Sequence, residues 1–177
     1  MVRYLPVLRK PLVFLVAFVA LFSFAACSSV DEQASVKTYN NSVVTIQKAM
    51  LQKAQDSSKI FQEAQIDNQK ILLTLQGIHN DILNSYKQFQ DMVVPKGAEP
   101  IADAMEKFFQ VETGGLDDII SGFQNFQKNQ SDPAAVAAFT ATLKSFTDRE
   151  SAALEDFYAI QQQVAAKYGQ KVGQTME

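Results

Sequence analysis

The chain has 177 residues, 47% of them hydrophobic, and a formal net charge of −3 at pH 7. Its charge is unevenly distributed: Arg3, Arg9 and Lys10 precede the single cysteine, Cys27, whereas every acidic residue follows it. The segment after residue 26 therefore carries a net charge of −6. An acidic surface repels phosphate groups, which excludes nucleic acid as the expected partner. This segment is long enough for one domain with a single hydrophobic core.

The first 26 residues have the order of a secretion signal. Three basic residues precede an uncharged run of 16 residues, 11–26, which ends in small residues. The run is shorter than the roughly 20 residues that span a bilayer comfortably, although a retained anchor helix is the alternative. We therefore expect residues 1–26 to be a signal peptide that is cleaved from the mature protein.

The residues Phe24-Ala25-Ala26-Cys27 resemble the lipobox of bacterial lipoproteins, in which the cysteine receives a diacylglyceryl group and a dedicated peptidase cuts before it. Phe24 departs from this pattern, which usually has an aliphatic residue there, and an ordinary signal peptidase could instead recognise Ser23-x-Ala25. Cys27 cannot form an internal disulfide because it is the only cysteine. The resemblance implies a protein held in the cell envelope by acyl chains on Cys27, since two or more chains give stable attachment. Ser28, rather than Asp, follows the cysteine, which favours the outer membrane.

The rest of the chain shows helical spacing with almost no strand alternation. Residues 28–35 are polar and aperiodic, so we predict a flexible tether between the lipid and the domain. Apolar residues then recur at intervals of three and four in four segments, at about 36–64, 68–93, 100–128 and 133–168. The break between the first two segments is ambiguous. Asp67-Asn68 could cap the second helix, which we prefer, or Asp56-Ser57-Ser58 could be the turn.

Three further signals set the other boundaries. Val94-Pro95-Lys96-Gly97 is a loop, Pro100 suits the first turn of the third helix, and Ser131-Asp132-Pro133 starts the fourth. The pair Gly114-Gly115 interrupts the third segment, where we expect a kink or a short break. Four long helices with short connections predict an all-α, antiparallel up-down-up-down four-helix bundle over residues 36–177.

The mature chain also resembles uncharacterised four-helix surface lipoproteins of bacteria with two membranes. The resemblance rests on Tyr39-Asn40 near the start of the first helix and on the loop Pro95-x-Gly97-x-Glu99 that precedes Ala104-Met105 and Phe108-Phe109. It spans most of the mature chain, on motifs of low specificity. It implies a helical fold and no known activity.

Polar residues occupy positions near the helix midpoints where the spacing favours apolar ones. They are Gln47, His79, Glu112 and Glu150. Midpoints of antiparallel helices meet at one height, so these residues could form a polar layer, and a histidine with two glutamates could supply three metal ligands. The simpler interpretation, which we favour because charges are rarely buried unpaired, has Glu112 facing water and His79 partly buried at the surface.

No signature of catalysis is present. The single histidine excludes two Glu-x-x-His motifs, and the chain contains no Cys-x-x-Cys-His, Gly-x-Ser-x-Gly or phosphate-binding loop. Phe61 and Phe109 lie at stripe edges and would mark a contact patch if exposed together. We expect a lipid-anchored, non-catalytic binding or structural module without metal or cofactor, whose partner is an unidentified envelope protein. The alternative is a small-ligand or metal-binding bundle that uses the polar layer of His79, Glu112 and Glu150.

Overall fold

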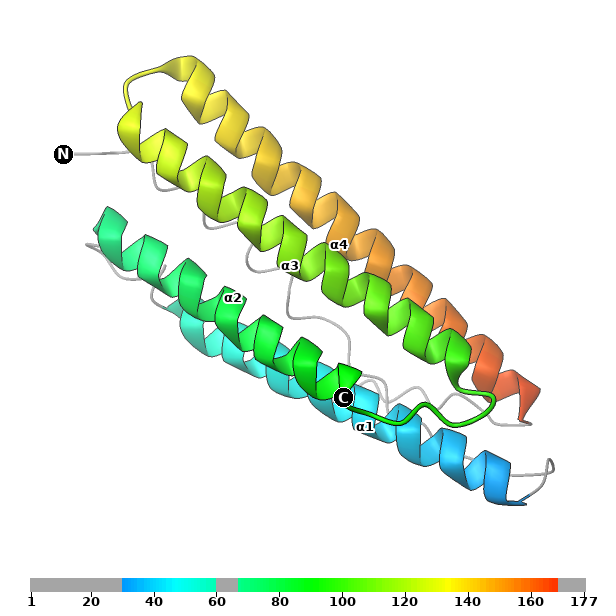
Figure 1. Ribbon diagram of the computed structural model, residues 1–177. Helices are drawn as coiled ribbons and strands as arrows, with labels where there is room; N and C mark the ends of the chain where they lie inside the picture. The colour runs from blue at the N-terminus through cyan, green and yellow to red at the C-terminus, as the bar shows by residue number, and fades with distance from the viewer. Residues whose placement is uncertain (1–29, 60–66, 169–177) are drawn as a thin grey trace.

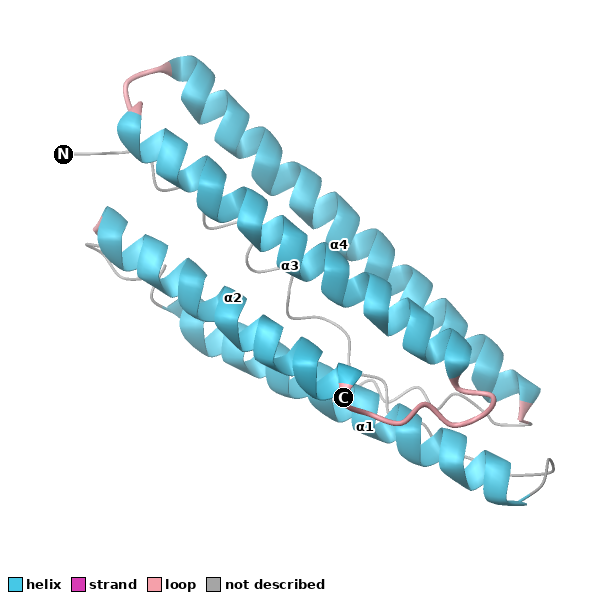
Figure 2. Cartoon of the chain, in the orientation of Figure 1, coloured by secondary structure: helices cyan, strands magenta, loops and turns pink. Residues whose placement is uncertain are grey.

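A computed structural model describes residues 30–59 and 67–168 of the chain. This part forms four α-helices and no strand: α1 (Val30–Ser58), α2 (Asn68–Gln90), α3 (Glu99–Lys128) and α4 (Pro133–Lys167) (Figures 1 and 2). The predicted all-α class is confirmed. The signal peptide, Cys27 and Phe61 lie outside the described residues.

Successive helices run in opposite directions and lie side by side in a bundle (Figure 1). The start of α1 lies beside the end of α4, where the Gln33 side chain donates a hydrogen bond to the carbonyl of Tyr168 at 3.5 Å. Helix α3 packs on both of its chain neighbours, and its contact with α4 is the most extensive in the fold.

The starts of α2 and α4 are set by aspartate caps, as the sequence indicates. The Asp67 side chain accepts a hydrogen bond from the backbone N–H of Lys70 at 2.7 Å, and Asp132 accepts one from Ala134 at 2.9 Å. These acceptors satisfy backbone donors that have no partner within the helix. Pro133 occupies the first turn of α4, where its missing N–H costs nothing.

The predicted boundaries of the first helix require correction. Helix α1 already begins at Val30, so residues 30–35 are helical and are not part of a flexible tether. This stretch is helical although it lacks an apolar period, because contacts with the end of α4 hold it: Glu32 accepts a hydrogen bond from the Tyr168 hydroxyl at 3.0 Å. The preferred cap at Asp67 is confirmed for α2, whereas Asp56, Ser57 and Ser58 are the last helical residues of α1 and not a turn. Residues 60–64 of the predicted helix lie outside the described residues.

The predicted break at Gly114-Gly115 is wrong, since α3 continues through the pair. Gly115 is buried against the Phe146 ring of α4, and a Cβ atom at residue 115 would lie 2.1 Å from Cδ2 of that ring. The glycine therefore serves close packing between α3 and α4 rather than a bend. Gly114 faces open space.

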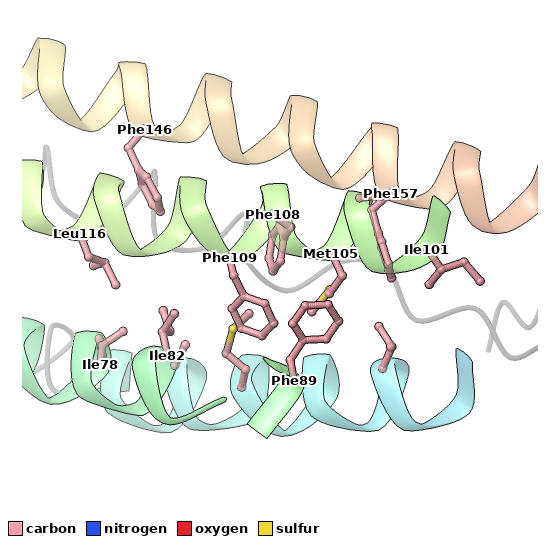
Figure 3. Close-up of a cluster of buried hydrophobic side chains, with 14 of the residues drawn as sticks. Ile78, Ile82, Phe89, Ile101, Met105, Phe108, Phe109, Leu116, Phe146 and Phe157 are labelled. Atoms are coloured by element: carbon pink, nitrogen blue, oxygen red, sulfur yellow. The ribbon is translucent and has the colours of Figure 1, made fainter. Parts of the chain in front are cut away.

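Large apolar side chains fill the centre of the bundle. Phe108 and Phe109 of α3 point into the core, and Phe89 of α2 faces Phe109 with 5.5 Å between ring centroids (Figure 3). The contact patch suggested for Phe109 is therefore wrong, because this side chain is 0% exposed. Val93, which the sequence placed on the apolar stripe of the second helix, lies beyond the end of α2 and is 89% exposed.

Candidate functional site

The most unusual group in the core is a pair of glutamates, one from α3 and one from α4. Glu112 is 2% exposed and Glu150 is 5% exposed, and their carboxyl groups form a hydrogen bond with each other. The spacing of apolar residues places both on the inner faces of their helices. The interpretation in which Glu112 faces water is therefore wrong.

Two carboxylates cannot both be charged in such a place, so the pair holds a proton. Burial, then the nearby charge of Glu150 and the hydrogen bond to it, raises the pKa of Glu112 well above its usual value. Burial raises the pKa of Glu150 to about 7, although accepting the hydrogen bond from Glu112 opposes this effect. Protonated Glu112 thus donates to Glu150, and the pair carries one negative charge once Glu150 ionises. The Oε1 atom of each carboxyl is buried without a hydrogen-bond partner among the described residues.

His79 does not join the glutamate pair. Its side chain is 17% exposed and lies toward α3, where Nε2 is 3.6 Å from Oδ1 of Asp117, beyond hydrogen-bond distance. The simpler interpretation, a partly buried surface histidine, is therefore correct for His79. The alternative of one polar layer is not supported, because among the described residues His79, Glu112 and Glu150 do not converge as metal ligands and His79 faces Asp117 instead.

The fourth predicted residue, Gln47, belongs to a separate row of polar contacts between α1 and α4. Gln47 is 4% exposed and its Nε2 donates to the Tyr158 hydroxyl at 3.5 Å. Further along, Gln161 Nε2 donates to Asn40 Oδ1 at 2.8 Å, and both side chains are buried. We call these two contacts the α1–α4 polar seam. They join an early residue of α1 to a late residue of α4, as antiparallel neighbours require.

Asn40 and Gln161 were not recognised as core residues from the sequence, although the signal was present. In α1 the positions 36, 40, 43, 47, 50 and 54 alternate steps of four and three, and all six are buried. Asn40 fits this series, and Gln161 fits the corresponding series of 157, 161, 164 and 168 in α4. Tyr39 lies beside the series with its hydroxyl buried; burial, then the charge of Asp103, raises its pKa to about 12.

A groove of moderate size lies on the described surface, and the glutamate pair is not part of it. It has a volume of about 470 Å³ and is lined by one face of α1 together with Met92. The hydroxyl groups of Thr38, Ser42 and Thr45 in this lining each donate to the α1 carbonyl four residues earlier. They are therefore already engaged within the helix, and the groove offers few free polar atoms to a ligand.

The two carboxyl groups lie in the core, and a buried carboxyl pair of this kind can hold and release one proton. Nowhere in residues 30–59 and 67–168 do three or more His, Cys, Asp or Glu side chains converge as metal ligands. None of the described helices combines the length and hydropathy of a membrane-spanning segment. We compared the chain with protein-family models, curated proteins and solved structures, and none of them matches it.

Proposed function

We propose that this protein is a lipid-anchored component of the bacterial cell envelope that acts as a non-catalytic binding or structural module. The observation that carries the proposal is the position of Cys27, the only cysteine of the chain, at the end of an uncharged run that follows three basic residues. A thiol in that position is the attachment point for acyl chains in bacterial lipoproteins. Ser28 favours sorting to the outer membrane.

The bundle supports a binding or structural role because its ionisable core groups face inward. The glutamate pair is buried between α3 and α4, away from the groove on α1, so it stabilises or tunes the fold rather than acting on a substrate. The acidic surface would meet a protein partner in the envelope. The alternative of a metal- or ligand-binding bundle retains only the two carboxyls, since His79 lies toward Asp117.

The position at which α1 begins limits how far the bundle can lie from an acylated Cys27. Only residues 28 and 29 separate Cys27 from the first residue of α1. An acylated Cys27 would therefore hold one end of the bundle close to the membrane, instead of allowing it to move on a long tether. A partner would be met by the sides and the far end of the bundle.

Labelling with radioactive palmitate in the native bacterium tests the anchor. The wild type and the matched control Ser28→Ala should both carry label in the membrane fraction, and Cys27→Ser should carry none. Wild-type protein that keeps its leader, or that is cut but free of fatty acid, would refute the proposal. Crosslinking in intact envelopes, followed by identification of the captured protein, then addresses the partner.

A further inference from the structure

The first and last helices, α1 and α4, are neighbours that no loop joins. Helices that follow one another in the chain pack closely, whereas the backbones of α1 and α4 approach each other least among neighbouring helices. These two helices can therefore move apart without breaking the chain and without disturbing the extensive contact between α3 and α4.

A row of buried side chains on α1 faces α4 at intervals of seven residues. Its members are Asn40, Gln47 and Ala54, and the first two make the amide contacts of the α1–α4 polar seam. Seven residues are about two helical turns, so all three share one face of α1. Because the helices are antiparallel, the step from Gln47 to Ala54 on α1 corresponds to a step from Tyr158 toward Glu150 on α4. Ala54 therefore lies at about the level of Glu150, where its methyl group offers no hydrogen bond.

The glutamate pair at this level lacks hydrogen-bond donors. Oε1 of Glu150 and Oε1 of Glu112 are buried without a partner among the described residues. A neutral pair tolerates this position, but a negative charge in the core requires further donors. The two levels before it each have an amide from α1, and this level has only Ala54.

The other charged groups near this level pair with one another across the outer faces of the bundle. They are Lys53 of α1 with Asp81 of α2, His79 of α2 with Asp117 of α3, and Arg149 of α4 with Asp118 of α3. None of them contributes to the pKa shift of Glu112 or Glu150, whose causes are burial and the other carboxyl. Among the described residues no cation is therefore placed to neutralise ionised Glu150, and water is the donor that remains.

The contacts between α1 and α4 are strongest at the start of α1 and weaken toward the glutamate pair. Glu32 accepts a hydrogen bond from the Tyr168 hydroxyl at 3.0 Å, and Asn40 accepts one from Gln161 at 2.8 Å. The next contact, from Gln47 to Tyr158, has lengthened to 3.5 Å. Water can therefore enter most easily beyond Gln47, along the second half of α1.

We propose that proton loss from the glutamate pair opens the bundle between α4 and residues 47–58 of α1, which admits water to Glu150. The start of α1 stays attached to α4 through Glu32 and Asn40, so the opening is partial and reversible. Water can also bond to Gln47 and Tyr158 once they separate, which limits the cost of opening. The pair and the seam thus form a pH-sensitive gate. This inference does not depend on the proposed anchor at Cys27.

Distances between pairs of spin labels test the gate in the full-length protein, purified in detergent at pH 5 and pH 8. The label pair for the gate is Ala49→Cys with Ala152→Cys, and the control pair is Ala34→Cys with Ala166→Cys at the attached end; all four alanines are exposed. Cys27 takes no label when it is acylated; if palmitate labelling shows that it is free, Cys27→Ser is added to every variant.

We expect the gate pair to gain a population that is longer by at least about 3 Å, the diameter of a water molecule. With a pKa of 4.5 when hydrated and about 7 when buried, Glu150 can raise the ratio of open to closed bundle by up to about 70-fold from pH 5 to pH 8. The control pair should not change. In the gate pair, Glu150→Gln should abolish the pH effect, and Glu155→Gln, at an exposed carboxyl of the same helix, should preserve it.

Three results would overturn the gate. Unchanged distances in the gate pair would show that the bundle stays closed around the ionised carboxyl. Equal lengthening in both pairs would mean that the whole bundle loosens, and a pH effect that persists in Glu150→Gln would assign it to another group. If Glu150→Gln does not fold, as judged by circular dichroism, Glu150→Met replaces it, since methionine cannot ionise either.

Discussion

Replacing Glu150 with glutamine should remove a pH-dependent loss of stability from the bundle. Burial raises the pKa of Glu150 from 4.5 in the unfolded chain to about 7 in the folded protein. As the pH rises, the unfolded chain releases this proton first. The stabilisation that protonated Glu150 gives to the folded state is therefore complete below pH 4.5. It is lost as the pH rises through the pKa of about 7 that Glu150 has in the folded protein. At about 1.4 kcal/mol per pH unit, the loss amounts to about 3 kcal/mol.

Glutamine cannot ionise, yet its amide oxygen can still accept the hydrogen bond from protonated Glu112. Glu150→Gln should match the wild type at pH 5 and exceed it by about 3 kcal/mol at pH 8, which corresponds to roughly 10 °C in melting temperature for a domain of this size. Denaturation in urea across this pH range measures the difference. The control is Glu155→Gln, an exposed carboxyl of the same helix, which should follow the wild-type curve. If the free energy of unfolding varied with pH in the same way for Glu150→Gln and the wild type, the carboxyl pair would not share a proton in a dry core.

Alanine substitutions at the two glycines of α3 should change the stability of the bundle in opposite directions, which the midpoint of urea unfolding measures. Gly115→Ala should destabilise the bundle by about 1–3 kcal/mol because its Cβ would overlap the Phe146 ring, whereas Gly114→Ala should stabilise it by about 1 kcal/mol through helix propensity alone. A shift in the same direction for both would contradict the close packing of α3 on α4. In the polar seam, Asn40→Leu should cost about 1–3 kcal/mol because it leaves buried Gln161 unpaired, and adding Gln161→Met should recover most of this loss in thermal unfolding.

The elements with strong local signals were predictable from the sequence. Asp132-Pro133 combines a capping carboxylate with a proline in the first turn, so its effect does not depend on distant residues. The three-and-four spacing likewise placed Glu112 and Glu150 on inner faces, and only the rarity of buried charge argued against their burial. A shared proton lowers the cost of burying two carboxyls together.

The remaining features depend on tertiary contacts that a local pattern does not reveal. Residues 30–35 carry no apolar period, yet Glu32 and Gln33 hold them in α1 through contacts with Tyr168, more than a hundred positions away. Gly115 indicates a helix break in isolation, but its lack of a side chain is matched to Phe146 on α4. The burial of His79 was also open, because it fits the apolar stripe of α2 in only one of the two possible phases of that stripe.

The polar seam between α1 and α4 also opposes sliding of one helix along the other. An apolar interface tolerates sliding, since one aliphatic side chain can replace another as a neighbour. A slide of α1 by one turn, about 5.4 Å, would separate Asn40 from Gln161 and Gln47 from Tyr158 and leave dehydrated amides unbonded. The two amide contacts therefore fix the axial register of α1 relative to α4.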